Sequence, residues 1–271
     1  MKRWLKAELH THTAEDPADG QRIVFHSPDQ LIDTAAERGF EVLAITNHDQ
    51  MLFDDRWEEY ARVRGILLIP GVEATLRGKH VLLYNFSNYD ASWKTPEIVS
   101  ENKGPGRLVM APHPFFPIST ALRRDFFCWI RLFDAVEYNH FYLPWVNFNH
   151  RAKAVARQFD LPLVGTSDAH QLYHLDHTYT LIYAEKQVAS VIEAIKQREV
   201  QIKTQPVDPF LVARWFVGNV MSQSSYSIRS LLGQGFPGLT KTSESRRRHS
   251  VKSVSKNLGW RFAARIGWKK N

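Results

Sequence analysis

The residues best suited to chemistry stand near the start of the chain, where Glu8-Leu9-His10-Thr11-His12 places two imidazoles one residue apart. In an extended strand the side chains at positions i and i+2 project from the same face, so His10 and His12 can reach one metal ion together. An isolated His-x-His pair is weak evidence, because most histidines are solvated or buried for structural reasons and bind no metal. The evidence for a metal site becomes stronger when the polar residues that follow this pair along the chain are considered.

Further His, Asp and Glu residues stand at the ends of later apolar segments, where the strands of a parallel barrel would bring them together. With the first pair, they are His10, His12, His48, Asp49, Glu73, His113, His140, Asp168 and His170. Imidazole nitrogen and carboxylate oxygen are ligands of Zn, Mn and Fe ions, and a carboxylate can bridge two ions whereas an imidazole cannot. The pattern therefore predicts a centre of two or three divalent metal ions. Such a centre converts a bridging water to hydroxide and binds a phosphoryl or acyl oxygen.

The elements expected to position these residues alternate between short apolar segments and longer amphipathic ones. The expected strands are Leu5–His12, Val42–Thr46, Leu67–Val72, Leu108–Ala111, Ala135–Tyr138, Leu163–Thr166 and Thr178–Tyr183. The expected helices begin at Ser27-Pro28 and end at Gly39, and span Asp54–Arg64, Asn149–Asp160 and Lys186–Arg198. Strands that alternate with helices predict an α/β fold with a parallel sheet, and closure into a barrel is the economical arrangement at this length.

The composition favours one main domain. The chain has 271 residues, 44% of them hydrophobic, which is enough to bury one sizeable core. Its single cysteine, Cys128, excludes an intramolecular disulfide and is interpreted as a core residue in a reducing compartment. No apolar run reaches the roughly 20 residues of a membrane-spanning helix, and Met1–Trp4 leads into a strand rather than a signal sequence. We therefore expect a cytoplasmic protein.

The net charge of +7 is concentrated towards the C-terminal end. Residues 240–271 contain ten Lys or Arg against one acid, a charge of +9, which leaves −2 for residues 1–239. We expect a barrel domain at 1–200, a helical extension at 201–240 and a basic, partly flexible tail at 241–271. The tail contains an amphipathic segment with Val254, Leu258, Phe262 and Ile266 at helical spacing. Binding to an anionic membrane surface, binding to nucleic acid and a solvated terminus all fit this tail.

Six short blocks carry a resemblance to a known family. They are Glu8–His12, Ala44–Asp49 (Ala-Ile-Thr-Asn-His-Asp), Pro70–Glu73 (Pro-Gly-Val-Glu), Ala111–Pro114 (Ala-Pro-His-Pro), Val136–His140 (Val-Glu-Tyr-Asn-His) and Gly165–His170 (Gly-Thr-Ser-Asp-Ala-His). In this order and at strand ends, they resemble the blocks of the polymerase and histidinol phosphatase (PHP) family over about residues 5–185. The resemblance implies a distorted seven-stranded (β/α)7 barrel whose two- or three-metal centre hydrolyses phosphate esters, followed here by the C-terminal helical and basic extension.

The resemblance also implies three groups of ligands. The first ion would be held by His10, His12, Glu73 and Asp168, the second by Glu73, His113 and His140, and the third by His48, His170 and an acid or His in the loop after the first strand. Many family members have Asp-Gly seven residues after the first histidine, where this chain has Pro17, so Asp16 and Asp19 are both candidates. His150 is a rival to His140, although it falls in the first turn of an expected helix.

Asp49 and His170 are also candidate catalytic residues, and Asp49 could orient the imidazole of His48 or accept a proton. The remaining histidines receive structural interpretations: His80 as a half-buried strand residue, His26 and His249 as solvated, and His174 and His177 as loop residues. Phosphate oxygens favour cationic partners, and Arg22, Lys103 and Arg107 are expected in loops near the mouth of the barrel.

The leading hypothesis is a metal-dependent phosphoesterase in which a metal-bridging hydroxide attacks the phosphorus of a phosphorylated small molecule. The second is a metal-dependent nuclease that uses the basic tail to bind DNA or RNA. The third is a non-catalytic metal-binding module recruited to nucleic acid or to a membrane, which would place the protein at the inner membrane surface. The sequence selects neither the metal nor the oligomeric state.

Overall fold

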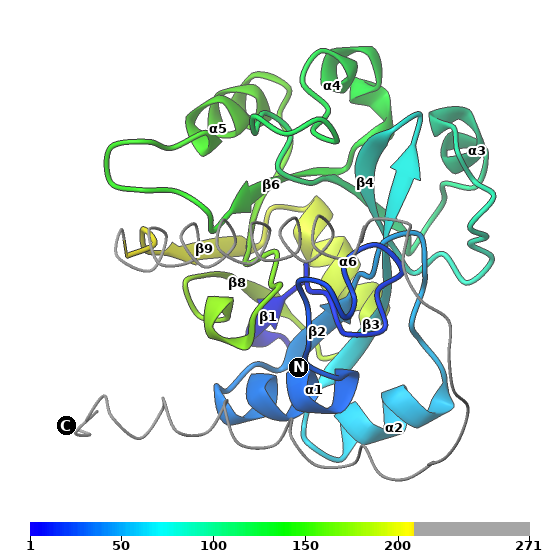
Figure 1. Cartoon of the computed structure of the whole chain (residues 1–271), viewed down its shortest axis with the longest axis vertical. Helices are drawn as coiled ribbons and strands as arrows, with labels where there is room; N and C mark the ends of the chain where they lie inside the picture. The colour runs from blue at the N-terminus through cyan, green and yellow to red at the C-terminus, as the bar shows by residue number, and fades with distance from the viewer. Residues whose placement is uncertain (209–271) are drawn as a thin grey trace, which may run out of the picture. The chain divides into compact units, whose positions relative to one another are not determined.

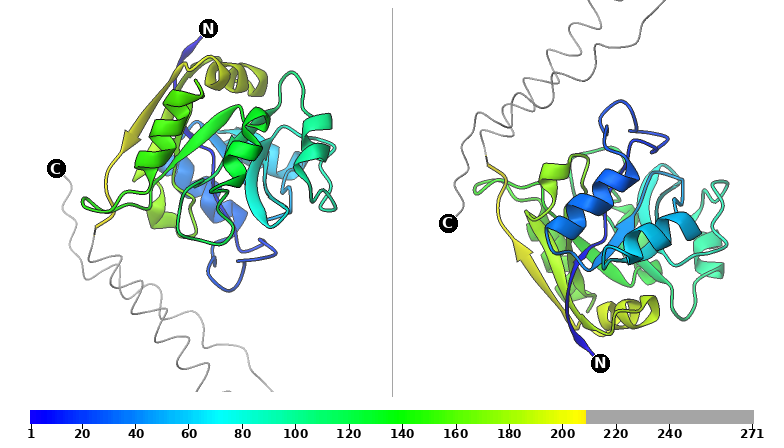
Figure 2. Two further views of the ribbon diagram at one scale, coloured as in Figure 1. Left: turned by 90° about the horizontal axis from the view of Figure 1, so that it is seen from above. Right: turned by 90° about the horizontal axis from the view of Figure 1, so that it is seen from below.

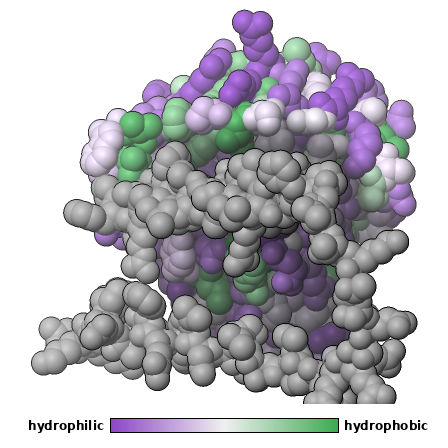
Figure 3. Space-filling model, viewed as in Figure 1, coloured by the Kyte–Doolittle hydropathy of each residue, from purple (hydrophilic) through white to green (hydrophobic). Residues whose placement is uncertain are grey.

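The computed structural model describes residues 1–208 of the chain (Figure 1). The predicted basic tail and nearly all of the predicted helical extension lie outside the described residues. Within residues 1–208, no helix is both long and apolar enough to cross a membrane. Where these residues can be seen in Figure 3, their surface is mainly hydrophilic, with hydrophobic residues interspersed.

The described residues form one sheet of nine strands with helices on its outer side (Figures 1 and 2). The strands are β1 (Arg3–Glu8), β2 (Val42–Ile45), β3 (Leu67–Leu76), β4 (Lys79–Tyr84), β5 (Leu108–Ala111), β6 (Ala135–Asn139), β7 (Leu163–Thr166), β8 (Thr178–Ala184) and β9 (Val200–Thr204). Their order across the sheet is β7-β6-β5-β4-β3-β2-β1-β8-β9. All seven predicted strands are present, but the predicted strand count was wrong because β4 and β9 join the same sheet.

The sheet is mixed rather than parallel, because β4 and β8 run antiparallel to both of their neighbours. Strand β4 pairs antiparallel with both β3 and β5, and β8 pairs antiparallel with both β1 and β9. Between β3 and β4 the chain turns at Arg77 and Gly78, whose φ angles are 47° and 76°. Positive φ at both central residues matches the twist of a tight hairpin, so the chain reverses in two residues.

The four predicted helices are present to within two residues at each end, and two short α-helices, α3 (Pro96–Glu101) and α4 (Asp125–Cys128), were not predicted. The predicted helices correspond to α1 (Pro28–Glu37), α2 (Asp55–Arg62), α5 (Asn149–Gln158) and α6 (Val188–Lys196), with short 3-10 helices η1 (Ile130–Leu132) and η2 (Leu172–His174) elsewhere. Ser27 caps α1 in a reciprocal pair with Gln30, and the Asp54 carboxylate caps α2. These local signals explain why the predicted starts were accurate.

The core is divided by the sheet. Residues from β1, β2 and β8, such as Leu5, Ala44 and Ile182, pack with α6, while α1 and α2 cover β2 and β3 through residues such as Ile32 and Trp57. On another part of the sheet α5 covers β6. Cys128 is exposed, so its interpretation as a core residue was wrong. Helix α4 is only four residues long and buries Phe126 instead.

The two arms of the sheet nearly close into a barrel at β7 and β8. These strands are not joined by a ladder, yet the Gly165 amide donates to Thr180 Oγ1 at 2.8 Å and that hydroxyl donates to the Gly165 carbonyl at 2.8 Å. One residue makes such a close approach possible, because Gly165 has no side chain between the strands. Near closure brings the carboxyl ends of β1 and β7 together.

We predict that Gly165→Ala destabilises the protein. The added Cβ would lie 2.7 Å from Ile202 Cγ2 and 3.1 Å from the Tyr179 carbonyl oxygen. Overpacking of this kind costs about 1–3 kcal/mol of unfolding free energy, which urea denaturation measures. Gly104→Ala is the control, because nothing lies within 4 Å of the corresponding Cβ position. Equal denaturation midpoints for the two variants would contradict the role given to Gly165.

Candidate metal centre

The first two candidate ligands lie just beyond β1, in backbone that stays extended. The His10 carbonyl accepts from the Ala169 amide at 3.0 Å, and the His12 amide donates to the Ala169 carbonyl at 3.1 Å. The predicted strand therefore ended four residues too late, at His12 instead of Glu8, but the extended geometry that lets His10 and His12 act together is present. Both side chains are fully buried.

The Glu73 carboxylate, buried to 1% exposure, is the centre of the cluster. Its Oε2 atom lies 3.1 Å from His10 Nε2, 3.3 Å from His12 Nε2 and 3.2 Å from His48 Nε2. Its Oε1 atom lies 3.1 Å from His113 Nε2. The two oxygens thus face two separate groups of imidazoles, as a carboxylate that bridges two ions must.

His80 joins this cluster, so its interpretation as an ordinary strand residue was incomplete. It stands half-buried on β4, with Nδ1 2.8 Å from Glu73 Oε1, and with His48 and Glu73 it forms a group that could hold an ion. The antiparallel pairing of Thr75 with His80 brings it there. Because the predicted fold did not pair this segment with β3, the sequence offered no reason to place His80 beside Glu73.

Two further carboxylates fix the orientation of the imidazoles. Glu137 Oε1 lies 2.6 Å from His10 Nδ1, and Asp16 Oδ2 lies 2.8 Å from His12 Nδ1 and 3.0 Å from His48 Nδ1. In all three rings Nδ1 is therefore engaged and Nε2 points to Glu73. A carboxylate on the second ring nitrogen is the usual way that a ligating histidine is held in one tautomer. Glu137 lay within a recognised block, but the sequence did not single it out.

The structure separates the two acids of the first loop. Asp16 is buried, and its oxygens also accept from the amides of Ala18 and His48, so it is suited to orient ligands. Asp19 Oδ2 instead lies 3.1 Å from His170 Nε2. Asp19 is therefore the better candidate to share an ion with His170.

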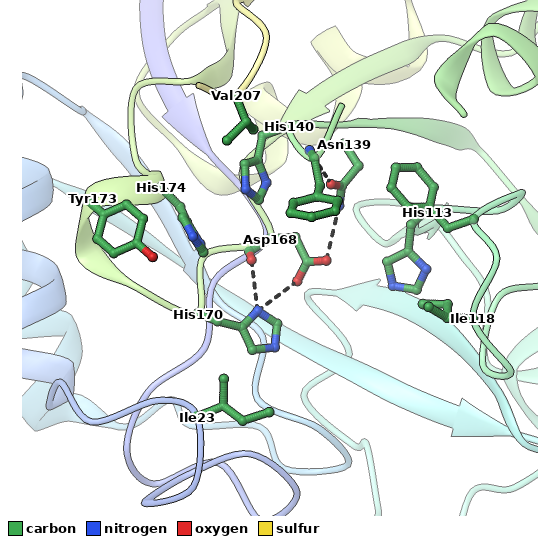
Figure 4. Close-up of a pocket in the computed structure, with 12 residues that line it drawn as sticks. Ile23, His113, Ile118, Asn139, His140, Asp168, His170, Tyr173, His174 and Val207 are labelled. Atoms are coloured by element: carbon green, nitrogen blue, oxygen red, sulfur yellow. Dashed lines mark hydrogen bonds and ion pairs between the residues drawn. The ribbon is translucent and has the colours of Figure 1, made fainter. Parts of the chain in front are cut away.

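Asp168 connects the centre to a neighbouring cavity. Its Oδ1 atom lies 3.4 Å from the Nε2 atoms of both His10 and His12, and its Oδ2 atom accepts from Asn139 Nδ2 at 3.1 Å. The His170 ring stands on its other side, with Nδ1 2.9 Å from the Asp168 carbonyl (Figure 4). Asp168 has a φ of 46° and His113 one of 28°. Left-handed backbone at non-glycine residues is typical of functional sites.

His140 is buried, but the structure does not bring it into hydrogen-bond distance of Glu73. Among residues 1–208 neither of its ring nitrogens has a hydrogen-bond partner, and its ring centroid lies 4.7 Å from that of His174. Figure 4 shows both rings beside Asp168. A buried imidazole without partners is available for an ion or a substrate, whereas its rival His150 is exposed on α5.

Three other expectations were wrong in whole or in part. His26 is buried rather than solvated, and its Nε2 donates to the His12 carbonyl at 2.8 Å. The Asp49 carboxylate faces the Thr75 amide, the Tyr89 hydroxyl and Lys94, and Asp16 takes the expected place beside the His48 ring. Lys103 and Arg107 precede β5 and so lie at the end opposite to His113. Arg22 is exposed and donates to the Ala18 carbonyl.

The electrostatics of the cluster are those of paired charges. Burial alone would raise the pKa of Glu73, but His80, His10 and His48 hold it well below its usual range. Burial alone would lower the pKa of His10, but Asp168, Glu73 and Glu137 raise it well above normal. A metal ion requires neutral imidazoles, so metal binding at this cluster should release protons.

The residues present fit divalent ions. Two ligand atoms about 2.0–2.2 Å from one tetrahedral ion are roughly 3.3 Å apart, and the nitrogen-to-oxygen distances around Glu73 Oε2 and Asp168 Oδ1 are 3.1–3.4 Å. Buried His12 Nε2 and His113 Nδ1 have no hydrogen-bond partner among the described residues. Groups able to hold an ion include His10, His12 and Glu73, and also His12, Asp168 and His170.

Comparison with known proteins agrees with this geometry. A family model described as PHP-associated matches residues 146–200, which include Asp168 and His170. The crystal structure of a two-domain protein from Bacteroides vulgatus, which contains a predicted PHP-like metal-dependent phosphoesterase, aligns with a TM-score of 0.62 at 21% identity. The alignment covers 75% of this chain and 66% of that one. The fold of this chain is therefore PHP-like.

Two other proteins are similar to this chain. An uncharacterised protein of Methanocaldococcus jannaschii is 27% identical over 124 residues, which cover 44% of this chain and 72% of that protein. PsfC from Pseudomonas syringae aligns with a TM-score of 0.55 at 17% identity, over 82% of this chain and 99% of its own. The structural alignments show a shared fold alone, so the reaction must be argued from the site.

We predict that Asp16→Asn weakens metal binding about 10–100-fold, the usual effect of losing an outer carboxylate. Asparagine has about the same shape, but a neutral amide is a weaker acceptor for the Nδ1 atoms of His12 and His48. Metal titration of the purified variant measures the effect. Glu15→Gln, a change at an exposed acid in the same loop, should leave the affinity unchanged. Unaltered affinity in Asp16→Asn would show that Asp16 does not orient the ligands.

Proposed function

We propose that the protein is a metal-dependent phosphoesterase that hydrolyses a phosphate ester at a centre of two or three divalent ions. One observation carries the proposal: each oxygen of the buried Glu73 carboxylate faces its own group of imidazoles. When bound, two ions bridged in this way supply an activated hydroxide and a clamp for the phosphoryl oxygens. The PHP fold supports the reaction class, because the Bacteroides vulgatus protein of this fold is described as a predicted metal-dependent phosphoesterase.

The chain would hold the ions with the residues that geometry brings together. His10, His12 and Asp168 would hold one ion with Glu73 Oε2, and His113 would hold a second with Oε1. His80 on the same oxygen and His140 by the cavity are the candidates to complete the second group. Asp19 and His170 would hold a third ion.

The protein's contribution to hydrolysis is position and charge. The ester is cleaved when water oxygen forms a bond to phosphorus, the bond to the alcohol oxygen breaks, and a proton passes to that oxygen. Glu137 and Asp16 keep the ring nitrogens pointed at the centre, so no reorientation is needed during the reaction. His170 is partly exposed beside the cavity, where it can also exchange a proton with solvent or substrate.

We predict that Glu73→Gln lowers turnover of a phosphoester panel by at least about 100-fold, the upper end of the loss caused by outer-sphere changes. The variant keeps the shape of the side chain but removes the charge that both groups of imidazoles share. Initial rates and metal content are measured on the same preparation, and Glu37→Gln at an exposed position on α1 is the control. Normal turnover with normal metal content in Glu73→Gln would refute the proposal.

The same panel separates the other two hypotheses. A nuclease would degrade single-stranded oligonucleotides faster than small phosphomonoesters, with strong salt dependence. A non-catalytic module would bind metal and turn over no substrate. The basic tail remains a proposed contact for an anionic membrane surface or for nucleic acid. Vesicle sedimentation with and without residues 240–271, at low and high salt, tests the membrane contact.

A further inference from the structure

A cavity of about 300 Å³ opens beside Asp168, at the low end of the usual size of small-molecule sites. Its polar side consists of the candidate ligands His113, His140, Asp168 and His170 with Asn139 and His174. Figure 4 shows these side chains converging from several strand ends, with Ile23 and Val207 around them. The cavity is therefore continuous with the metal centre.

The remaining lining is apolar apart from the hydroxyl group of Tyr173. It is formed by Ile23, Phe116, Ile118, Phe141, Tyr173 and Val207. Phe116 and Val207 are buried, whereas Ile118, Phe141 and Tyr173 are 43%, 42% and 45% exposed at the mouth. Contact between these exposed hydrophobic side chains and an apolar part of a ligand would remove both from water, which is favourable.

The charge of the lining limits which ligands the cavity can bind. Within residues 1–208, no lysine or arginine lines this cavity. Arg22, in the same loop as Ile23, instead donates to the Ala18 carbonyl, and Lys103 pairs with Asp134 at the opposite end of the barrel. A second phosphate or a sugar placed on these walls would lose water and could gain a partner only in the Tyr173 hydroxyl, which is unfavourable. Only a phosphoryl group placed at the polar side of the cavity would find binding partners.

We propose that this cavity binds the alcohol portion of the substrate, and that the substrate is a phosphate monoester of an apolar alkyl or aryl alcohol. This inference rests on the proposed phosphoesterase function, because it assigns the metal centre to the phosphoryl group. The cavity then divides one ligand between two environments, with the phosphate at the histidines and Asp168 and the hydrocarbon between Ile118, Phe141 and Tyr173.

The test uses n-alkylphosphonates from ethyl to octyl, which cannot be hydrolysed, titrated into the full-length protein by calorimetry. The protein carries the metal with which it is purified. Because burial of each methylene contributes up to about fourfold in affinity, we expect Kd to fall steadily along the series until the chain outgrows the cavity. Equal Kd values from ethyl to octyl would overturn the proposal, as would tighter binding of a nucleoside bisphosphate than of octylphosphonate.

Variants of the lining test whether the hydrocarbon chain binds in this cavity. Ile118→Ser and Phe141→Ser should flatten the dependence of Kd on chain length, whereas Val63→Ser should preserve it, since Val63 is 61% exposed beyond the last turn of α2 and does not line the cavity. The changed side chains are partly exposed, so the variants should fold, and thermal unfolding verifies this. An equal dependence in all three variants would overturn the assignment of the cavity.

Hydrolysis of the matching alkyl phosphates separates this inference from the proposed function. These esters have leaving groups of similar basicity, so a rise of kcat/KM with chain length reports binding of the hydrocarbon. Turnover that ignores chain length would contradict the inference and support the phosphoesterase. No turnover of any ester would contradict the phosphoesterase, while the phosphonate Kd series would still decide whether the cavity binds apolar chains.

Discussion

The structure depends on the burial of one carboxylate, that of Glu73, among imidazoles from several strands. A buried carboxylate without partners is very costly, and so is a buried group of positively charged histidines. Each compensates the other only if the ends of β1, β2, β3, β4 and β5 meet at one place. The mixed order of the sheet and its near closure at Gly165 are therefore conditions for the centre as well as features of the fold.

A second layer of carboxylates makes this arrangement specific. Imidazole has two nitrogens, and a ring that is free to flip offers either of them to an ion. Glu137 and Asp16 engage Nδ1 of His10, His12 and His48, which leaves Nε2 for the centre in each case. Glu8 acts on the backbone: its Oε1 accepts from the amides of His10 and Ser167, so it ties the end of β1 to the end of β7. Burial raises the pKa of Glu8 to about 8 even with these hydrogen bonds, because this layer is shielded from water.

Much of this was readable from the sequence because the signals are local. Strand ends, helix caps such as Ser27, and the order of the six blocks predicted which elements form and where most candidate ligands meet. What could not be predicted depends on long-range pairing. The Arg77-Gly78 turn lacks the usual Asn-Gly signal, so β4 was not paired and His80 was misjudged. The separate roles of Asp16 and Asp19 follow from which imidazole each one meets, and sequence spacing alone does not determine that.

The polar and apolar parts of the cavity support one another physically. Apolar walls exclude water from the space beside Asp168, and exclusion of water strengthens every charge interaction at the histidine side. Divalent ions at that side would supply the positive charge that a phosphoryl group needs, so the walls require no lysine or arginine. A polyanion would gain from the ions only at one phosphate and would lose hydration at the others. The apolar walls that would favour the proposed hydrolysis at this centre therefore disfavour long nucleic acids within the cavity, whatever the basic tail binds.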